Sequence, residues 1–378
     1  MLFQKIKAIF IAIRDLEVDF QLSEFSAKEI DALLNMQLGP LLYFLANRHT
    51  QEKLNESMDK LASAAIYAKF TTQQNLGVVV SLASYCQKQQ ITMTLLKGIS
   101  TSTELYPEPH LRVMGDIDLL FKERDFILVD NYLKDNGFIQ KSLYSDEFYK
   151  NLHHDMPYYH AKKDCWIEIH HHLFSPQSKF SNEPIFLMAD DNRCLSQIIG
   201  VDVYRFRVEL QLIYTVIHWS ESSNCISGRM AILDVILLCS KYKQEIDWQW
   251  IAHRLSNSLC AQPMFILLSF LSRNGLVLGV EQELYKWRNY PIKQNSISLY
   301  IAHKVITKWF FEDIDLKAKF LTVNNLELIW RTLLTNQLAV VKVFLLLWNI
   351  GFPPDNPRKF NLRFQWRRLK VMLGRSVE

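Results

Sequence analysis

The sequence predicts an α+β fold in which a small mixed β-sheet lies between N-terminal and C-terminal helical regions. Apolar residues recur at helical spacing before residue 90 and after residue 177, whereas the segment between them has the period of strands. Glycine, at 11 of 378 residues, is too scarce for a large all-β fold rich in tight turns. The length exceeds what one compact core usually holds. We therefore expect three regions: residues 1–90, 91–176 and 177–378.

The N-terminal region, residues 1–90, is expected to be helical throughout. Ile6, Ile9, Phe10 and Ile13 recur at helical spacing, and further leucines and alanines continue this pattern. No residue there suggests chemistry. We interpret the region as a scaffold.

A strand followed by a glycine and a hydroxyl-rich helix start is expected at residues 91–106. Residues 91–96 have strand character, Lys97 and Gly98 follow, and Ser100 lies in the first turn of a short helix over residues 99–106. Glycine allows close backbone approach, and a helix N-terminus presents free N–H groups to an anion. The segment is a candidate phosphate cradle, although an ordinary strand–helix turn has the same pattern.

Two aspartates interrupt the next predicted strand, at residues 112–121. Asp116 and Asp118 stand at i and i+2, so their side chains project from the same face. Two like charges at that separation repel, and a divalent cation such as Mg²⁺, which prefers oxygen ligands, would reverse the repulsion. The alternative interpretation is a strand end whose carboxylates are simply solvated.

An amphipathic helix over residues 125–136 and then a hairpin are expected next. The hairpin joins residues 153–160 to residues 166–173 through a polar turn. In its second strand the alternation predicts one face that carries four side chains: Trp166, Glu168, His170 and His172.

The segment from 91 to 173 thus offers three carboxylates, those of Asp116, Asp118 and Glu168, beside a candidate phosphate cradle. This combination is what two-metal phosphoryl transfer requires, because one cation activates the attacking hydroxyl and the other neutralises the leaving pyrophosphate.

The same segments resemble the uncharacterised bacterial nucleotidyltransferase family of the DNA polymerase beta-like nucleotidyltransferase superfamily. The resemblance covers residues 80–250, including helices that follow the sheet. The residues that carry it are Leu95-Leu96-Lys97-Gly98, Arg112, Asp116-Ile117-Asp118-Leu119-Leu120, Asn136-Gly137-Phe138 and Ile167-Glu168-Ile169-His170.

The resemblance implies a nucleotidyltransferase core at residues 91–176 that moves a nucleoside monophosphate from a nucleoside triphosphate to an acceptor and releases pyrophosphate. The implied cofactor is Mg²⁺ or Mn²⁺. The implied acceptor is a small molecule, a peptide or a protein, with RNA less favoured. Asp116, Asp118 and Glu168 would be both the catalytic residues and the metal ligands. The residues expected to contact the nucleotide are Lys97, Gly98, Ser100, Arg112 and His170.

The glycine motif departs from the broad superfamily pattern, which places a Gly-Ser or Gly-Gly pair shortly before the first acidic residue. Here Ile99 follows Gly98, and Asp116 lies 18 residues beyond Gly98. The family named above uses a Lys-Gly pair with this longer gap.

Two other functional classes remain open. A zinc hydrolase could use Glu168, His170 and His172, which are residue types that zinc accepts. A non-catalytic binding module could have kept the fold without the activity, which the irregular glycine motif favours and the intact carboxylates oppose.

Two polar residues in the following apolar helices are interpreted as structural. His218 is expected to be a core histidine, with a role in a pocket as the minority interpretation. Asp234 lies in an apolar run, and a buried carboxylate needs a partner. We expect an ion pair with Arg229.

Residues 178–378 are predicted to be helical throughout. The expected helices are 207–219, 229–243, 247–258, 262–272, 295–311 and 326–350. Residues 358–375 hold seven basic and no acidic residues, so they could contact an anionic surface, although a solvated final helix is the preferred interpretation.

The composition gives few further constraints. The formal net charge of +4 is too small over this length to argue for nucleic-acid binding. The six cysteines are scattered without a Cys-x-x-Cys pair, which is typical of reduced thiols in a cytoplasmic protein. No stretch is expected to span a membrane.

Overall fold

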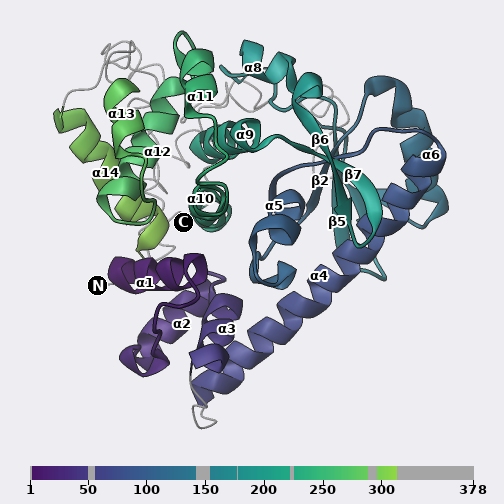
Figure 1. Cartoon of the computed structure of the whole chain (residues 1–378). Helices are drawn as coiled ribbons and strands as arrows, with labels where there is room; N and C mark the ends of the chain where they lie inside the picture. The colour runs from purple at the N-terminus through teal and green to yellow at the C-terminus, as the bar shows by residue number, and fades with distance from the viewer. Residues whose placement is uncertain are drawn as a thin grey trace, which may run out of the picture. The chain divides into compact units, whose positions relative to one another are not determined.

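The computed structural model describes residues 2–49, 56–141, 154–176, 178–221, 225–287 and 296–312 (Figure 1). The chain divides into two compact units, with a boundary at residues 290 and 291. The sheet and the residues of the candidate active site lie in the first unit. The described part of the second unit consists mainly of the helix α14 (Ser296–Phe311).

Helices make up most of the described chain. The α-helices of the first unit are α1 (Leu2–Arg14), α2 (Ala27–Asn35), α3 (Gly39–His49), α4 (Glu56–Lys88), α5 (Lys97–Leu105), α6 (Phe126–Asp135), α8 (Pro184–Leu187), α9 (Val208–Glu221), α10 (Cys225–Lys241), α11 (Trp248–Leu255), α12 (Ala261–Arg273) and α13 (Glu281–Trp287). Short 3₁₀ helices are η1 (Leu22–Glu24), η2 (Pro109–Leu111), η3 (Glu123–Asp125) and η4 (Ala189–Asn192).

In the described residues, seven strands form one mixed sheet in the order β3-β4-β5-β2-β1-β7-β6. The strands are β1 (Thr94–Leu95), β2 (Ile117–Leu120), β3 (Ile139–Gln140), β4 (Tyr158–His160), β5 (Cys165–His170), β6 (Arg193–Ile198) and β7 (Val201–Phe206). The β2–β5 and β1–β7 pairs are parallel, and the other neighbours are antiparallel.

One face of the sheet is apolar and packs against α4 and α6. Ile117 and Leu119 of β2 and Ile167 and Ile169 of β5 are buried in one cluster with residues of both helices, such as Leu82. Because side chains alternate along a strand, the residues between them project from the opposite face. The pleat therefore separates the core of the sheet from its polar face.

Local signals explain where several helices begin and end. Ser26 and Glu29 form a reciprocal capping box at the start of α2. The long α4 ends where Gln90 takes a left-handed backbone (φ 58°) and the Ile91 N–H donates to the Cys86 carbonyl. This is the point at which the sequence predicted a change of period.

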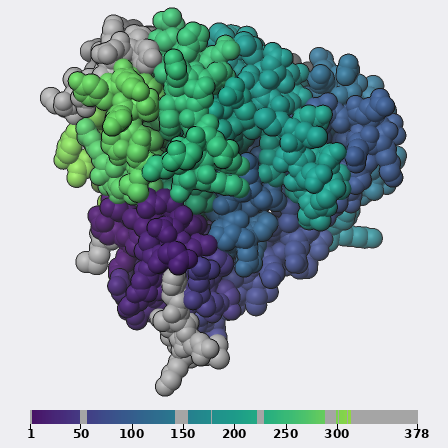
Figure 2. Space-filling view, viewed as in Figure 1, coloured from purple at the N-terminus to yellow at the C-terminus, as the bar shows by residue number. Residues whose placement is uncertain are grey.

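The N-terminal helical prediction is confirmed for the described residues. Helices α2 and α3 pack against α4, and Figure 2 shows their surface in purple adjoining that of α4. Arg14 at the end of α1 donates to the carbonyls of Gly275 and Leu276 at 2.8 and 2.9 Å. The first unit thus joins residues from both ends of its sequence.

The prediction that residues 178–378 are helical throughout is wrong for residues 193–206. These residues form the β6–β7 hairpin, and β7 pairs with β1 at Thr94 and Tyr204. The burial of β6 alternates poorly, with several exposed residues, because it is an edge strand. The sheet therefore includes strands from both sides of the predicted boundary at residue 176.

Most other elements match their predictions. The hairpin of β4 and β5 and the α6 helix with its stop at Gly137 (φ +83°) are confirmed. Helices α8 and α13 lie in the region predicted to be helical but outside the individual helices expected there. The expected helix at 326–350 and the basic residues 358–375 lie outside the described residues. In the described part of the chain, no helix is both long and apolar enough to cross a membrane.

We predict that Leu119→Ala lowers the free energy of unfolding by about 2–4 kcal/mol, because Leu119 is fully buried on the helix-covered face of the sheet. The matched control is Leu195→Ala on the edge strand β6, where the side chain is 63% exposed. There the change should stay within about 0.5 kcal/mol. Urea unfolding of both variants measures the difference, and equal losses would show that this face of β2 is not the core.

Candidate active site

The register of two parallel strands brings two carboxylates together. Asp118 of β2 is the direct partner of Glu168 of β5, and both residues lie on the face opposite the apolar core. Partners in adjacent strands have neighbouring Cβ atoms on the same face. The sequence could show the alternation within each strand, but only the pairing shows that these two acids are neighbours.

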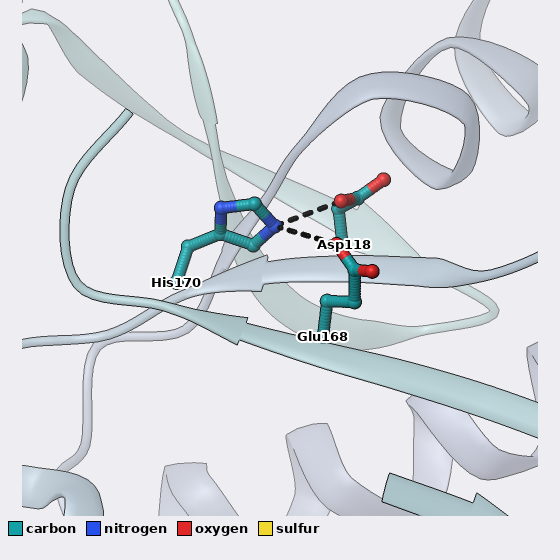
Figure 3. Close-up of side chains that lie close together, drawn as sticks. All are labelled: Asp118, Glu168 and His170. Atoms are coloured by element: carbon teal, nitrogen blue, oxygen red, sulfur yellow. Dashed lines mark hydrogen bonds and ion pairs between the residues drawn. The ribbon is translucent and has the colours of Figure 1, made fainter. Parts of the chain in front are cut away.

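His170 and Lys97 approach these carboxylates. His170 Nε2 lies 2.8 Å from Asp118 Oδ1 and 3.6 Å from Glu168 Oε2 (Figure 3). Lys97 Nζ donates to the same Asp118 oxygen at 2.6 Å. The Leu96 N–H donates to the Asp118 carbonyl at 3.0 Å, so the backbone pairing next to Lys97 holds the lysine beside Asp118.

Lys97 has an unusual backbone. Its φ of 44° lies in the left-handed region, which costs a residue with a Cβ atom about 1–2 kcal/mol. Such conformations persist where the surrounding contacts determine them, and they are common at functional sites. The chain enters α5 through this residue and Gly98 directly after it.

Charges of opposite sign shape the protonation of the cluster. Burial alone would raise the pKa of Asp118, but Lys97 and His170 hold it well below its usual value. Burial alone would likewise lower the pKa of His170, but its contacts with Asp118 and Glu168 raise it. Burial alone would raise the pKa of Glu168 as well, but His170, Lys97 and His154 together lower it. Asp118 and Glu168 are therefore ionised at neutral pH and lie against Lys97 and His170.

Asp116 lies directly before β2 and has the opposite shift. Repulsion by Asp118 is the main cause, followed by burial and Glu168, and together they raise the pKa of Asp116 from 3.8 to about 7. The two aspartates thus influence each other strongly, as their i, i+2 spacing predicted. A cation at Asp116 would relieve this repulsion.

Asp116 and Asp118 border a cavity of about 400 Å³. One wall is charged and comes from the segment between Lys97 and Asp118, with Asp234 of α10. The other wall comes from α9 and α10 and carries Tyr214, His218 and other uncharged residues. The volume suits a small molecule of nucleotide size.

The model of a family described as "uncharacterised nucleotidyltransferase" matches residues 27–274. This chain belongs to that nucleotidyltransferase family. The match extends from α2 to the residue after α12 and includes every strand of the sheet.

Two further comparisons accompany the family match. The chain is similar to a solved structure described as an antigenic nucleotidyltransferase-like protein from Paracoccidioides brasiliensis, with 17% identity and a TM-score of 0.35, over 56% of this chain and 92% of that chain. Comparison with curated proteins finds no match. The family assignment therefore rests on the family match alone.

The residues that could hold a metal ion differ in one member from the predicted set. Within the described residues, the ligand atoms of Asp118, Glu168 and His170 all lie within 4.8 Å of one another. His170 was expected to contact the nucleotide, and the structure places it against both carboxylates. Asp116 lies beside this cluster, on the cavity side.

The expected partner of Asp234 is wrong. Arg229 donates to the Met36 carbonyl at 2.9 Å instead. Asp234 pairs with Arg112, whose Nη2 lies 3.0 Å from Asp234 Oδ2, and accepts a bond from the Tyr106 hydroxyl at 2.8 Å. Arg112 was expected to contact phosphate. It does border the cavity, but its guanidinium is already held by a buried carboxylate from α10.

Only part of the predicted phosphate cradle lines the cavity. Lys97 and Gly98 border the cavity, whereas Ser100 does not and is fully buried within α5. Ser100 is therefore not part of the candidate cradle. A Cβ atom on Gly98 would lie 3.3 Å from Met114 Cβ and from Arg112 Nη1. Glycine at this position is thus also explained by close packing.

The histidines near Glu168 are not the ones that the strand alternation predicted. Strand β5 ends at His170, so His172 does not continue the alternation and lies in an exposed position instead. His154 approaches the cluster, with Nε2 at 3.9 Å from Glu168 Oε2. Its isolated bridge with His170 brings it there. The zinc interpretation therefore loses His172 as a ligand.

His218 borders the cavity on α9, so the minority interpretation of a role in a pocket is the one that its position supports. Burial, with a smaller contribution from Lys97, lowers the pKa of His218 to about 3. The imidazole is therefore neutral at physiological pH. The sequence signal for this placement was the spacing of Tyr214 and His218, four residues apart on one helix.

We predict that Asp116→Asn stabilises the metal-free protein at pH 8 more than at pH 5. The raised pKa of Asp116 means that its protonated form contributes stability below the unfolded pKa near 4, and this contribution is lost as the pH rises through 7. Asparagine is uncharged at both values. The difference in unfolding free energy between variant and wild type should be about 2 kcal/mol larger at pH 8.

Urea unfolding in a chelator at both pH values measures this effect. Asp135→Asn, at an exposed position at the end of α6, is the control and should show no such pH dependence. A loss of stability for Asp116→Asn at pH 8 would instead show that Asp116 forms a structural ion pair with a cationic side chain.

Proposed function

We propose that this protein transfers a nucleoside monophosphate from a nucleoside triphosphate to an acceptor nucleophile, with two Mg²⁺ or Mn²⁺ ions held by Asp116, Asp118 and Glu168. The observation that carries the proposal is the register of β2 and β5, which pairs Asp118 with Glu168 beside a cavity that also contains Asp116. Family membership supports the reaction class.

The residues present fit divalent cations. Asp118, Glu168 and His170 offer ligand atoms within 4.8 Å of one another, and Asp116 adds a carboxylate whose raised pKa reflects uncompensated repulsion. Carboxylate oxygens are the ligands that Mg²⁺ and Mn²⁺ prefer. Such ions would neutralise the charge on the triphosphate and make the acceptor group more acidic.

The chain's own groups would carry out the remaining work. In the proposed step the acceptor oxygen or nitrogen attacks the α-phosphorus, the bond from that phosphorus to the bridging oxygen breaks, and pyrophosphate leaves. Glu168 takes the proton of the acceptor, with His154 3.9 Å from the same carboxylate. Lys97 and the backbone at Gly98 border the cavity where the triphosphate would lie.

The same layout suggests which side of the site receives the acceptor. Glu168 of β5 pairs with Asp118 and has His154 beside it, whereas Lys97, Gly98 and Asp116 line the cavity. We place the triphosphate in the cavity and the acceptor on the side of Glu168. The acceptor's chemical class is a small molecule, a peptide or a protein.

The reaction is tested with labelled nucleotides. Purified protein is incubated with Mg²⁺, each α-phosphate-labelled nucleoside triphosphate in turn and a cell extract, and the label is followed into products. We predict transfer by the wild type and a rate at least about a hundredfold lower for Asp118→Asn, because a charged ligand for the cation is lost. Asp135→Asn should transfer at the wild-type rate. Absence of transfer with all four nucleotides would favour the non-catalytic binding module.

A zinc site is the second candidate, because the cluster includes the His170 imidazole. The zinc hypothesis and the nucleotidyltransferase hypothesis differ at Asp116, which the zinc cluster does not need. We predict that Asp116→Asn abolishes transfer, and that the purified wild type retains no stoichiometric zinc. Metal content by mass spectrometry decides. One zinc per chain that is lost in His170→Ala and kept in Asp116→Asn would overturn the nucleotidyltransferase reading.

A further inference from the structure

Tyr214 is a buried tyrosine whose hydroxyl has no hydrogen-bond partner among the described residues. The residue is 0% exposed and borders the cavity from α9. A buried hydroxyl without a partner costs about 1–3 kcal/mol, so native proteins rarely retain one without a reason. The other buried tyrosines in the described part of the chain are paired: Tyr106 donates to Asp234 and Tyr158 to Asp130.

The ring of Tyr214 is held in place by aromatic neighbours. Its centroid lies 5.7 Å from that of Phe174, 5.9 Å from Phe206 and 6.5 Å from Phe186, all in edge-on arrangements. These contacts come from three separate parts of the chain. A ring packed in this way directs its hydroxyl with little loss of side-chain freedom on binding.

The surroundings of the hydroxyl are charged. Burial raises the pKa of Tyr214 well above its usual value, Lys97 opposes this shift, and Asp118 and Glu168 add to it. The phenol is therefore protonated at neutral pH and can donate a hydrogen bond. Tyr214 lines the same cavity as Lys97, Asp116 and Asp118, where the cations and the phosphates would lie.

We propose that the Tyr214 hydroxyl contacts the donor nucleotide directly, donating a hydrogen bond to a phosphate oxygen. This inference rests on the proposed function. A phosphate oxygen is an anionic acceptor, which suits a neutral donor that has no partner and lies near Lys97. Since Lys97 is engaged with Asp118 and Arg112 with Asp234, the tyrosine supplies a donor that no acidic residue of the site occupies.

The test compares Tyr214→Phe with the wild type and with Tyr158→Phe, in which a buried tyrosine on β4 loses a hydroxyl that is hydrogen-bonded. Calorimetric titration with inorganic triphosphate and with each nucleoside triphosphate, all with Mg²⁺, measures binding. Tyr214→Phe should weaken inorganic triphosphate and nucleotide by the same factor of about ten. Its melting temperature without ligand should be equal to or above that of the wild type. Tyr158→Phe should bind normally and melt lower.

The outcomes separate the two proposals. Unchanged affinities in Tyr214→Phe overturn the inference and leave the proposed function standing, if the wild type binds nucleotide. A loss of nucleotide affinity without a loss for inorganic triphosphate means that the hydroxyl contacts the nucleoside, which also overturns it. A wild type that binds neither ligand contradicts the proposed function itself, and the role of Tyr214 falls with it. A lower melting temperature in Tyr214→Phe would mark the hydroxyl as structural.

Discussion

The register between β2 and β5 is the constraint on which the site depends. It pairs Asp118 with Glu168 on one face while Ile117, Leu119 and their partners fill the core on the other. A slip by one residue would move the acids into the apolar core and the isoleucines into the site. The hydrophobic packing under α4 and α6 therefore also fixes the geometry of the carboxylates.

Bringing these carboxylates together is costly, since buried like charges repel and lose hydration. Lys97 and His170 offset this cost for Asp118, but Asp116 retains a pKa of about 7. The charge of Asp116, which borders the cavity, is thus not fully compensated by cationic side chains. Selection for stability alone would not favour buried carboxylates that repel one another, whereas a cation-binding site requires them.

The sequence predicted what short-range pattern encodes. The strand that carries Asp118, the hairpin that contains Glu168 and the end of α6 before Gly137 follow from alternation and turn chemistry, and the structure has them. The predicted strand at 112–121 is shorter in the structure, where β2 begins at Ile117 and Asp116 lies directly before it. Contacts between distant residues were missed. The expected partner of Asp234 was Arg229, the nearest arginine in the sequence. The fold instead brings Arg112 to it across 122 residues.

Strands at the edge of the sheet were also beyond the pattern. The β6–β7 hairpin is exposed along much of β6, so its hydrophobic alternation is weak, and it was read as helical with its surroundings. The prediction for His172 was wrong for a different reason. Its alternation was assumed to continue after β5 had ended, and sequence periodicity does not show where a strand ends.

The cavity shows why the helices after the sheet cannot be treated as a separate scaffold. One wall comes from the segment between Lys97 and Asp118, and the other from α9 and α10. Asp234 of α10 holds Arg112 of the first wall, and Tyr214 of α9 lies within reach of the charges on Lys97 and Asp118. A fragment that ended at residue 176 would keep the three carboxylates but would lose the neutral wall, the β6–β7 strands and the anchor of Arg112. The site is therefore a property of the sheet and the following helices together, which agrees with a family match that runs to residue 274.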